Sequence, residues 1–161
     1  MKKPFLNPSL DRAGLDAKIK MILEILRKRG WSIGIMESCT GGAISNALTN
    51  IPGASDVFKR GLVTYSDEAK IKAGVEEEII KKNGVYSMNV AEEMARKIEG
   101  EVGVGVTGNL PGQVYIAVKV QEKIFGRKIK IENGDEDKIE GRKEMKKIVL
   151  ENVVDMIIDG L

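Results

Sequence analysis

A short segment of small and hydroxyl-bearing residues is the part of the sequence best suited to chemistry. Residues 37–42 read ESCTGG and lie between an apolar stretch that predicts a buried strand and a stretch with helical spacing. Free main-chain NH groups at such a turn suit an anion or a developing oxyanion. The same residues would serve equally well as a helix N-cap with glycines for a tight turn, and spacing alone leaves both alternatives open.

A second glycine motif has weaker support as a nucleotide site. Gly103, Gly105 and Gly108 spell GxGxxG, which indicates a dinucleotide-binding fold only where it leaves a strand and opens a helix. Here a short turn and another strand are predicted to follow. We therefore predict glycines in a strand and a turn, where a neighbouring element approaches closely.

The residue types present limit the chemistry. The chain has 161 residues, no histidine, and Cys39 as its one cysteine. These counts remove His/Cys metal sites, every mechanism with a histidine base and any internal disulfide. For Cys39 we expect a buried structural thiol. No metal and no organic cofactor is predicted.

Composition and charge bound the class of protein. Hydrophobic residues make up 42% and charged residues 31%, without an apolar run of the roughly 18 residues that a membrane helix needs. The 26 basic and 24 acidic residues are interspersed, and only three Phe, three Tyr and one Trp are present, which disfavours nucleic-acid binding. The start of the chain has no secretory apolar stretch, so we expect a cytoplasmic protein without membrane association.

Helices and strands alternate along the chain and must position these residues. Ser66 is the expected N-cap of a helix over 66–73, and Ser87 or Asn89 is the expected N-cap of a helix over 88–98. The pattern predicts one α/β domain over residues 1–161, a three-layer sandwich whose mixed β-sheet is covered by helices on both faces. The polar segment 133–140 is predicted to be a surface loop. Helices are expected over 10–29, 43–50, 66–73, 88–98 and 142–158, and strands over 31–36, 61–65, 102–107, 113–120 and 123–132.

A longer stretch of the sequence resembles a known family. ESCTGG, followed by IPGASDVFKRGLVTYSDEAKIKAGV, is similar to the signature of the CinA C-terminal domain, whose members include nicotinamide-nucleotide amidases. The close match covers residues 37–75, and NGVYS, GVTG and VYIAV resemble later parts of the domain. The resemblance implies hydrolysis of nicotinamide mononucleotide to nicotinate mononucleotide and ammonia, and a homo-oligomer.

The resemblance also implies roles for individual residues. It makes Ser38 the nucleophile and Lys70 the base, with Tyr65 beside them in the same motif. Without histidine, a serine needs another base, and a lysine whose pKa is lowered by burial can take its proton. Tyr65 is the third candidate catalytic residue. From the residues alone, Lys70 would be a solvent-exposed helix lysine, and Tyr65 would pack in the core as readily as act in catalysis. The implied substrate-binding residues are Thr40, Gly41 and Gly42 through their main chain, Thr107 and Gly108 in GVTG, and Arg142, in GRKEMKK, toward the substrate phosphate.

Two departures from the family pattern bear on function. The segment 109–112 is shorter than the family's loop rich in glycine and proline, which helps to form the substrate pocket. A second hypothesis is therefore a catalytically silent nucleotide-binding or regulatory module of the same fold. The inserted-looking segment NGDEDKIE, residues 133–140, leaves open whether the family's arginine corresponds to Arg142 or Lys143. A third hypothesis, a role linked to nucleic acid, rests only on the family's competence-related name.

Overall fold

Five strands form one sheet in the order β2-β1-β3-β4-β5. β1 pairs in parallel with β2 and β3, whereas β4 runs antiparallel to both β3 and β5. The sheet is therefore mixed, and the carboxyl ends of its three parallel strands meet at one edge. The computed structural model describes residues 8–132 and 135–161. The strands are β1 (Ile33–Glu37), β2 (Phe58–Val63), β3 (Val102–Gly108), β4 (Gly112–Val120) and β5 (Lys123–Ile131).

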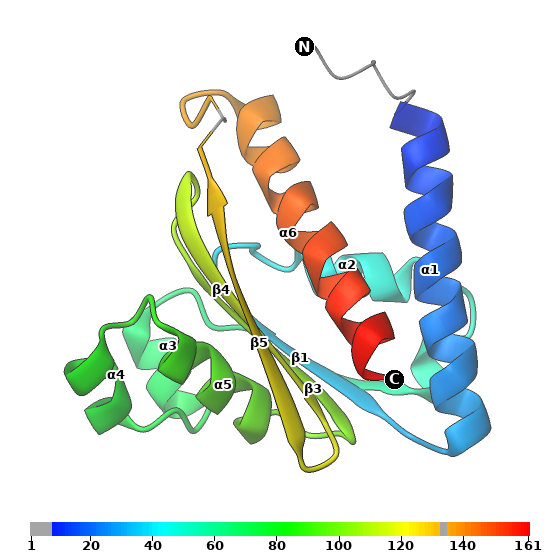
Figure 1. The fold of residues 1–161 in the computed structure, drawn as a ribbon, viewed down its shortest axis with the longest axis horizontal. Helices are drawn as coiled ribbons and strands as arrows, with labels where there is room; N and C mark the ends of the chain where they lie inside the picture. Colours follow the sequence, from blue (N-terminus) through cyan, green and yellow to red (C-terminus); the bar gives the residue numbers. More distant parts are fainter. Residues whose placement is uncertain (1–7, 133–134) are drawn as a thin grey trace.

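Helices cover both faces of the sheet (Figure 1). One layer holds α1, α2 and α6, and the other holds α3, α4 and α5. This arrangement confirms the predicted three-layer α/β architecture. The helices are α1 (Pro8–Arg29), α2 (Ala43–Thr49), α3 (Asp67–Lys72), α4 (Glu77–Asn83), α5 (Met88–Lys97) and α6 (Ile139–Gly160), with a short 3₁₀ turn at Ala54–Asp56.

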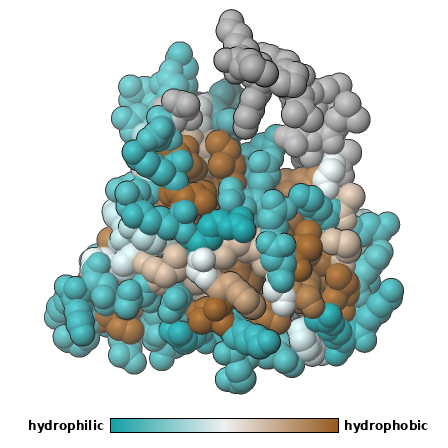
Figure 2. Space-filling model, in the orientation of Figure 1, coloured by the Kyte–Doolittle hydropathy of each residue, from teal (hydrophilic) through white to brown (hydrophobic). Residues whose placement is uncertain are grey.

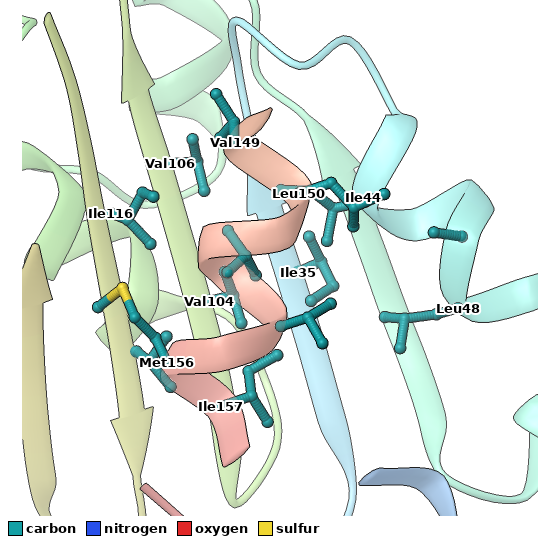
Figure 3. Packing of buried hydrophobic residues seen from close by; sticks show 14 of the residues in the cluster. Ile35, Ile44, Leu48, Val104, Val106, Ile116, Val149, Leu150, Met156 and Ile157 are labelled. Carbon is teal, nitrogen blue, oxygen red and sulfur yellow. The ribbon is translucent and has the colours of Figure 1, made fainter. Parts of the chain in front are cut away.

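The larger hydrophobic core lies between α6 and the sheet. Ile35, Val104 and Ile116 come from three neighbouring strands and face the apolar side of α6, with α2 packed alongside (Figure 3). Because successive side chains of a strand point to opposite faces, Met36 enters a second cluster beneath α5. Strand β1 is buried at every position, so it is held from both sides and fixes the residue that follows it.

Glycines in β3 allow α5 to approach closely, as the strand interpretation of GxGxxG predicts. A Cβ atom at Gly103 would collide with the carbonyl oxygen of Ala95, and one at Gly105 with that of Ala91. A Cβ atom at Gly108 would meet the carbonyl oxygen of Gln113 in the turn to β4. The motif therefore serves packing in this fold.

Several element boundaries differ from the sequence prediction. β2 runs over 58–63 instead of 61–65. Its ends are set by pairing with β1, because apolar and polar residues alternate only weakly along this strand. Helix α4 was not predicted, since it buries no residue fully and so lacks a clear apolar repeat. α6 begins at Ile139, within the segment predicted to be a loop, of which residues 133 and 134 lie outside the described part. Ser66 and Ser87 accept the N-cap hydrogen bonds of α3 and α5.

The surface is mixed in character. On the face shown in Figure 2, hydrophilic side chains predominate and hydrophobic ones emerge in separate patches. Among the helices of the described part, none is long and apolar enough to cross a membrane.

Candidate active site

Ser38 and Lys70 meet at the carboxyl edge of the parallel strands. Ser38 directly follows β1, while Lys70 lies in α3, which begins soon after β2. The Lys70 Nζ donates to the Ser38 Oγ across 3.1 Å and to the carbonyl oxygen of Thr64 across 2.8 Å. The relative exposures of Ser38 and Lys70 are 4% and 1%. The expectation from the residues alone, that Lys70 is exposed to solvent, is therefore wrong.

The environment of Lys70 favours its neutral form. Burial lowers the pKa of Lys70 below its ordinary value of 10.5, while the negative charge of Asp67 raises it and so offsets part of the shift. A neutral amine can accept a proton from a hydroxyl group within hydrogen-bonding distance. The pair has the geometry of a nucleophile with its base.

Glu37 organises the loop that carries Ser38, a role that was missed from the sequence. Its carboxylate is fully buried and accepts five hydrogen bonds. They come from the Thr40 and Ser45 hydroxyl groups and from the main-chain NH groups of Gly42, Ile44 and Ser45. Glu37 thereby satisfies the start of α2, where NH groups lack intrahelical partners. The carboxylate in ESCTGG, six positions before the first residue of α2, was the available signal.

The structure corrects the expectation of free NH groups at Gly41 and Gly42. The Gly41 NH donates to the Ser38 carbonyl oxygen and the Gly42 NH to Glu37 Oε1, each across 2.9 Å. Both glycines have positive φ, 59° and 99°, so they serve the tight turn. Within the described residues, the Thr40 NH donates to no protein acceptor, which leaves Thr40 as the candidate oxyanion donor of the three.

A small pocket of about 120 Å³ opens beside Ser38. Tyr65 and Tyr86 are well exposed at this site, with relative exposures of 65% and 46%. Tyr86, in the turn before α5, was not predicted, because aromatic residues in turns carry no distinctive spacing. The pocket is lined by Ser38, Cys39, Tyr65, Tyr86, Gly108, Asn109, Leu110 and Arg142.

Arg142 connects the start of α6 with the shortened loop. Its Nη1 donates to the Leu110 carbonyl oxygen across 3.0 Å, and its side chain lines the pocket. Lys143 instead turns its Nζ to Glu140, 2.9 Å away. Of the two alternatives for the cation, Arg142 is therefore the one at the site.

Thr107 and Thr64 are buried threonines, and their chain neighbours Gly108 and Tyr65 line the pocket. The Thr107 hydroxyl group donates to the Val85 carbonyl oxygen across 3.0 Å, so Thr107 holds the segment that leads to Tyr86, while its neighbour Gly108 lines the pocket. Among the described residues, Thr64 has the one buried side-chain polar atom without a hydrogen-bond partner. These two threonines thus differ in whether their hydroxyl groups are satisfied.

Cys39 is buried and lies next to the candidate nucleophile. Burial raises the pKa of its thiol to about 11, with the nearby positive charges of Lys70 and Lys146 opposing the shift. A thiol is a poor nucleophile while it keeps its proton. Within the described part of the chain, no group of three or more Cys, Asp or Glu side chains could hold a metal ion.

The sequence of this fold matches the CinA C-terminal domain over residues 16–157. The chain belongs to the CinA C-terminal domain family. Two CinA-like proteins illustrate the relationship: the one from Kosmotoga olearia is 35% identical over 147 residues, covering 82% of this chain and 35% of that protein. The one from Chloroherpeton thalassium is 51% identical over 90 residues, covering 53% and 21%. The chain spans between 19% and 35% of the length of such relatives.

Solved structures of the family share the fold. The competence/damage inducible protein CihA from Agrobacterium tumefaciens superposes with a TM-score of 0.80 at 29% identity, covering 90% of this chain and 94% of that one. A competence-damaged protein (CinA) superfamily protein from Escherichia coli superposes with a TM-score of 0.81 at 20% identity, covering 91% and 90%. The second likeness concerns the fold alone.

Proposed function

We propose that this CinA C-terminal domain hydrolyses the carboxamide of nicotinamide mononucleotide, releasing ammonia and nicotinate mononucleotide. The observation that carries the proposal is the buried pair of Ser38 and Lys70, with 3.1 Å between Oγ and Nζ. The chain has no histidine, so a lysine with a lowered pKa is the base that a serine nucleophile requires.

The first half of the reaction forms an acyl-enzyme. The Ser38 Oγ attacks the carboxamide carbon while its proton passes to the neutral amine of Lys70. The tetrahedral oxyanion accepts a hydrogen bond from the Thr40 NH. When the carbon–nitrogen bond breaks, the Lys70 ammonium returns the proton to the leaving nitrogen, and ammonia departs.

The second half regenerates the serine. Lys70, again neutral, takes a proton from a water molecule that attacks the ester carbon. Collapse of the second tetrahedral intermediate breaks the bond to the Ser38 Oγ, which recovers a proton from Lys70. The product is the carboxylic acid, which loses its proton to solvent to become the carboxylate, and Tyr65 and Tyr86 flank the opening through which it leaves.

Ammonia release from nicotinamide mononucleotide tests the proposal. Ser38→Ala and Lys70→Met should each lower the rate at least about 1,000-fold, because either change removes one member of a unit. Lys72→Ala is a matched control on the same helix, and its exposed side chain should leave the rate unchanged. Melting temperatures establish that each variant is folded. A wild type that releases no ammonia would refute the amidase.

One observation favours the alternative of a silent nucleotide-binding module. The pocket volume of about 120 Å³ falls below the roughly 300–1,000 Å³ typical of ligand sites, and the Arg142 contact with Leu110 holds the short loop over it. Binding of nicotinamide mononucleotide by a wild type that does not turn it over would favour this module.

A further inference from the structure

The buried amine of Lys70 has room for one more hydrogen bond. Across residues 14–132 and 135–161, its Nζ has two partners, the Ser38 Oγ at 3.1 Å and the Thr64 carbonyl oxygen at 2.8 Å. An ammonium group carries three N–H donors. Because Lys70 is only 1% exposed, bulk water does not reach the third donor. Once Lys70 has taken a proton, it therefore needs another acceptor from the protein.

Thr64 has the opposite deficit, an acceptor without a donor. Its hydroxyl oxygen has no hydrogen-bond partner, although Thr64 is only 3% exposed. The main chain of Thr64 is fixed on both sides, because its NH donates to the Glu37 carbonyl oxygen across 2.8 Å and its carbonyl oxygen accepts from Lys70. The free hydroxyl group thus belongs to the residue that the Lys70 Nζ already contacts. A buried hydroxyl group left unpaired is rare and destabilising, so we expect a state of the protein in which it is paired.

We propose that the Thr64 hydroxyl group accepts the third N–H of Lys70 when Lys70 carries the proton taken from Ser38, which makes Thr64 a positioning residue of the pair. The inference rests on the proposed function, in which this proton transfer occurs. Rotation about the Thr64 Cα–Cβ bond redirects the hydroxyl group without moving the main chain. With an acceptor for each N–H, the ammonium is stabilised by charge-assisted hydrogen bonds and stays oriented until it returns the proton.

Other groups act on the charge of Lys70 but do not fill this position. Burial lowers the pKa of Lys70, whereas Asp67 in the first turn of α3 and Cys39 in the loop after β1 raise it. Burial raises the pKa of the Cys39 thiol to about 11, which leaves the Asp67 carboxylate as the charged group of the two at neutral pH. Neither group is among the hydrogen-bond partners of Nζ in the described part of the chain. Thr64 would add a directed contact to their undirected effect.

A titration of Lys70 tests the contact without turnover. Nuclear magnetic resonance of protein with isotope-labelled lysine follows the Lys70 Cε signal, which Lys70→Met assigns by its loss. In Thr64→Val, Lys70 should titrate about one pH unit lower than in the wild type, because its ammonium loses an acceptor. Thr64→Ser should restore the wild-type titration. Thr107→Val is the matched control and should leave the titration unchanged, because the Thr107 hydroxyl group is also buried but donates to Val85.

Turnover gives a second readout, measured at a pH above both titrations. Thr64→Val should lower kcat for ammonia release about tenfold, the effect of one modest hydrogen bond in the transition state, and leave KM unchanged. Its melting temperature should stay at or above that of the wild type, whereas loss of a purely structural contact would lower it. Thr64→Ser should keep the wild-type kcat. The inference is overturned by an unchanged Lys70 titration in Thr64→Val, by a wild-type kcat in that variant, or by Thr64→Ser behaving like Thr64→Val.

The two readouts separate this inference from the amidase. A Lys70 titration that depends on the Thr64 hydroxyl group, in a protein that releases no ammonia, keeps the contact and rejects the amidase. Ammonia release by a protein whose Lys70 titration is indifferent to Thr64→Val does the reverse.

Discussion

Lys70 reaches Ser38 across 32 positions of the sequence, and the two side chains meet inside the protein with 3.1 Å between Nζ and Oγ. The parallel pairing of β1 with β2 makes this possible, because Glu37 lies opposite Val63, so the chain leaves both strands at the same edge. The Thr64 carbonyl oxygen then fixes the lysine from the β2 side. The position of the candidate base is thus determined by sheet register.

Ammonia release should rise with pH. In the proposed reaction the base is the neutral amine of Lys70, whose pKa lies below the ordinary value of 10.5 because of burial. The rate should be low while Lys70 is protonated, increase tenfold per pH unit, and level off above the lowered pKa, before pH 10.5 is reached. A pH profile of kcat/KM measures this. Lys70→Arg should be inactive throughout, since a guanidinium stays protonated; a flat profile for the wild type would contradict a lysine base.

Glu37→Gln should destabilise the fold by about 3 kcal/mol. The amide has one acceptor oxygen in place of two, so its NH2 group would face NH donors of the α2 start and leave buried groups unsatisfied. Urea denaturation at pH 7 provides the measurement. Glu99→Gln is the control. It removes a carboxylate that pairs with Arg60 and whose side chain is 70% exposed, so the free energy of unfolding should change by less than about 1 kcal/mol. Similar losses in both variants would show that Glu37 has no special role.

The layered fold and most helices follow from apolar periodicity, but the site depends on contacts that periodicity does not encode. The spacing of ESCTGG left an anion site and a tight turn equally open, and the positive φ values at Gly41 and Gly42 belong to the turn. The spacing gives no signal for Lys70, since a lysine on a helix is normally solvated. Its burial exists only once α3 lies against the loop after β1.

Gly105→Ala should destabilise the protein by about 2–3 kcal/mol. The added methyl group would overlap the Ala91 carbonyl oxygen, so α5 would have to move away from β3. Gly14→Ala is the matched control, because a Cβ atom there meets no other side chain or neighbouring element within 4 Å. Gly14 lies in α1, where alanine should raise the free energy of unfolding by about 0.5–1 kcal/mol. Thermal unfolding compares the two. Equal melting temperatures would argue against the close approach.

Thr64→Val should leave stability unchanged or raise it by about 1 kcal/mol. The buried Thr64 hydroxyl group has no hydrogen-bond partner, and replacing an unsatisfied polar group by an apolar one of similar shape removes its desolvation cost. Thr107→Val should lower stability by about 1 kcal/mol, because the Val85 carbonyl oxygen loses its donor. Chemical denaturation ranks the two variants, and the reverse order would contradict this account.

The hairpin of β3 and β4 stays in register up to Gly108 opposite Val114, and the Asn109 NH closes it onto Gln113. Beyond that point only a short connection overhangs the opening beside Ser38. A longer or shorter connection between β3 and β4 would therefore leave the Ser38–Lys70 pair in place, because that pair is held by the segments after β1 and β2. If the pair acts on amides as proposed, reactivity resides in Ser38 and Lys70 and substrate choice in the connection, so changes confined to one bend would alter the amide accepted and leave the pair in place.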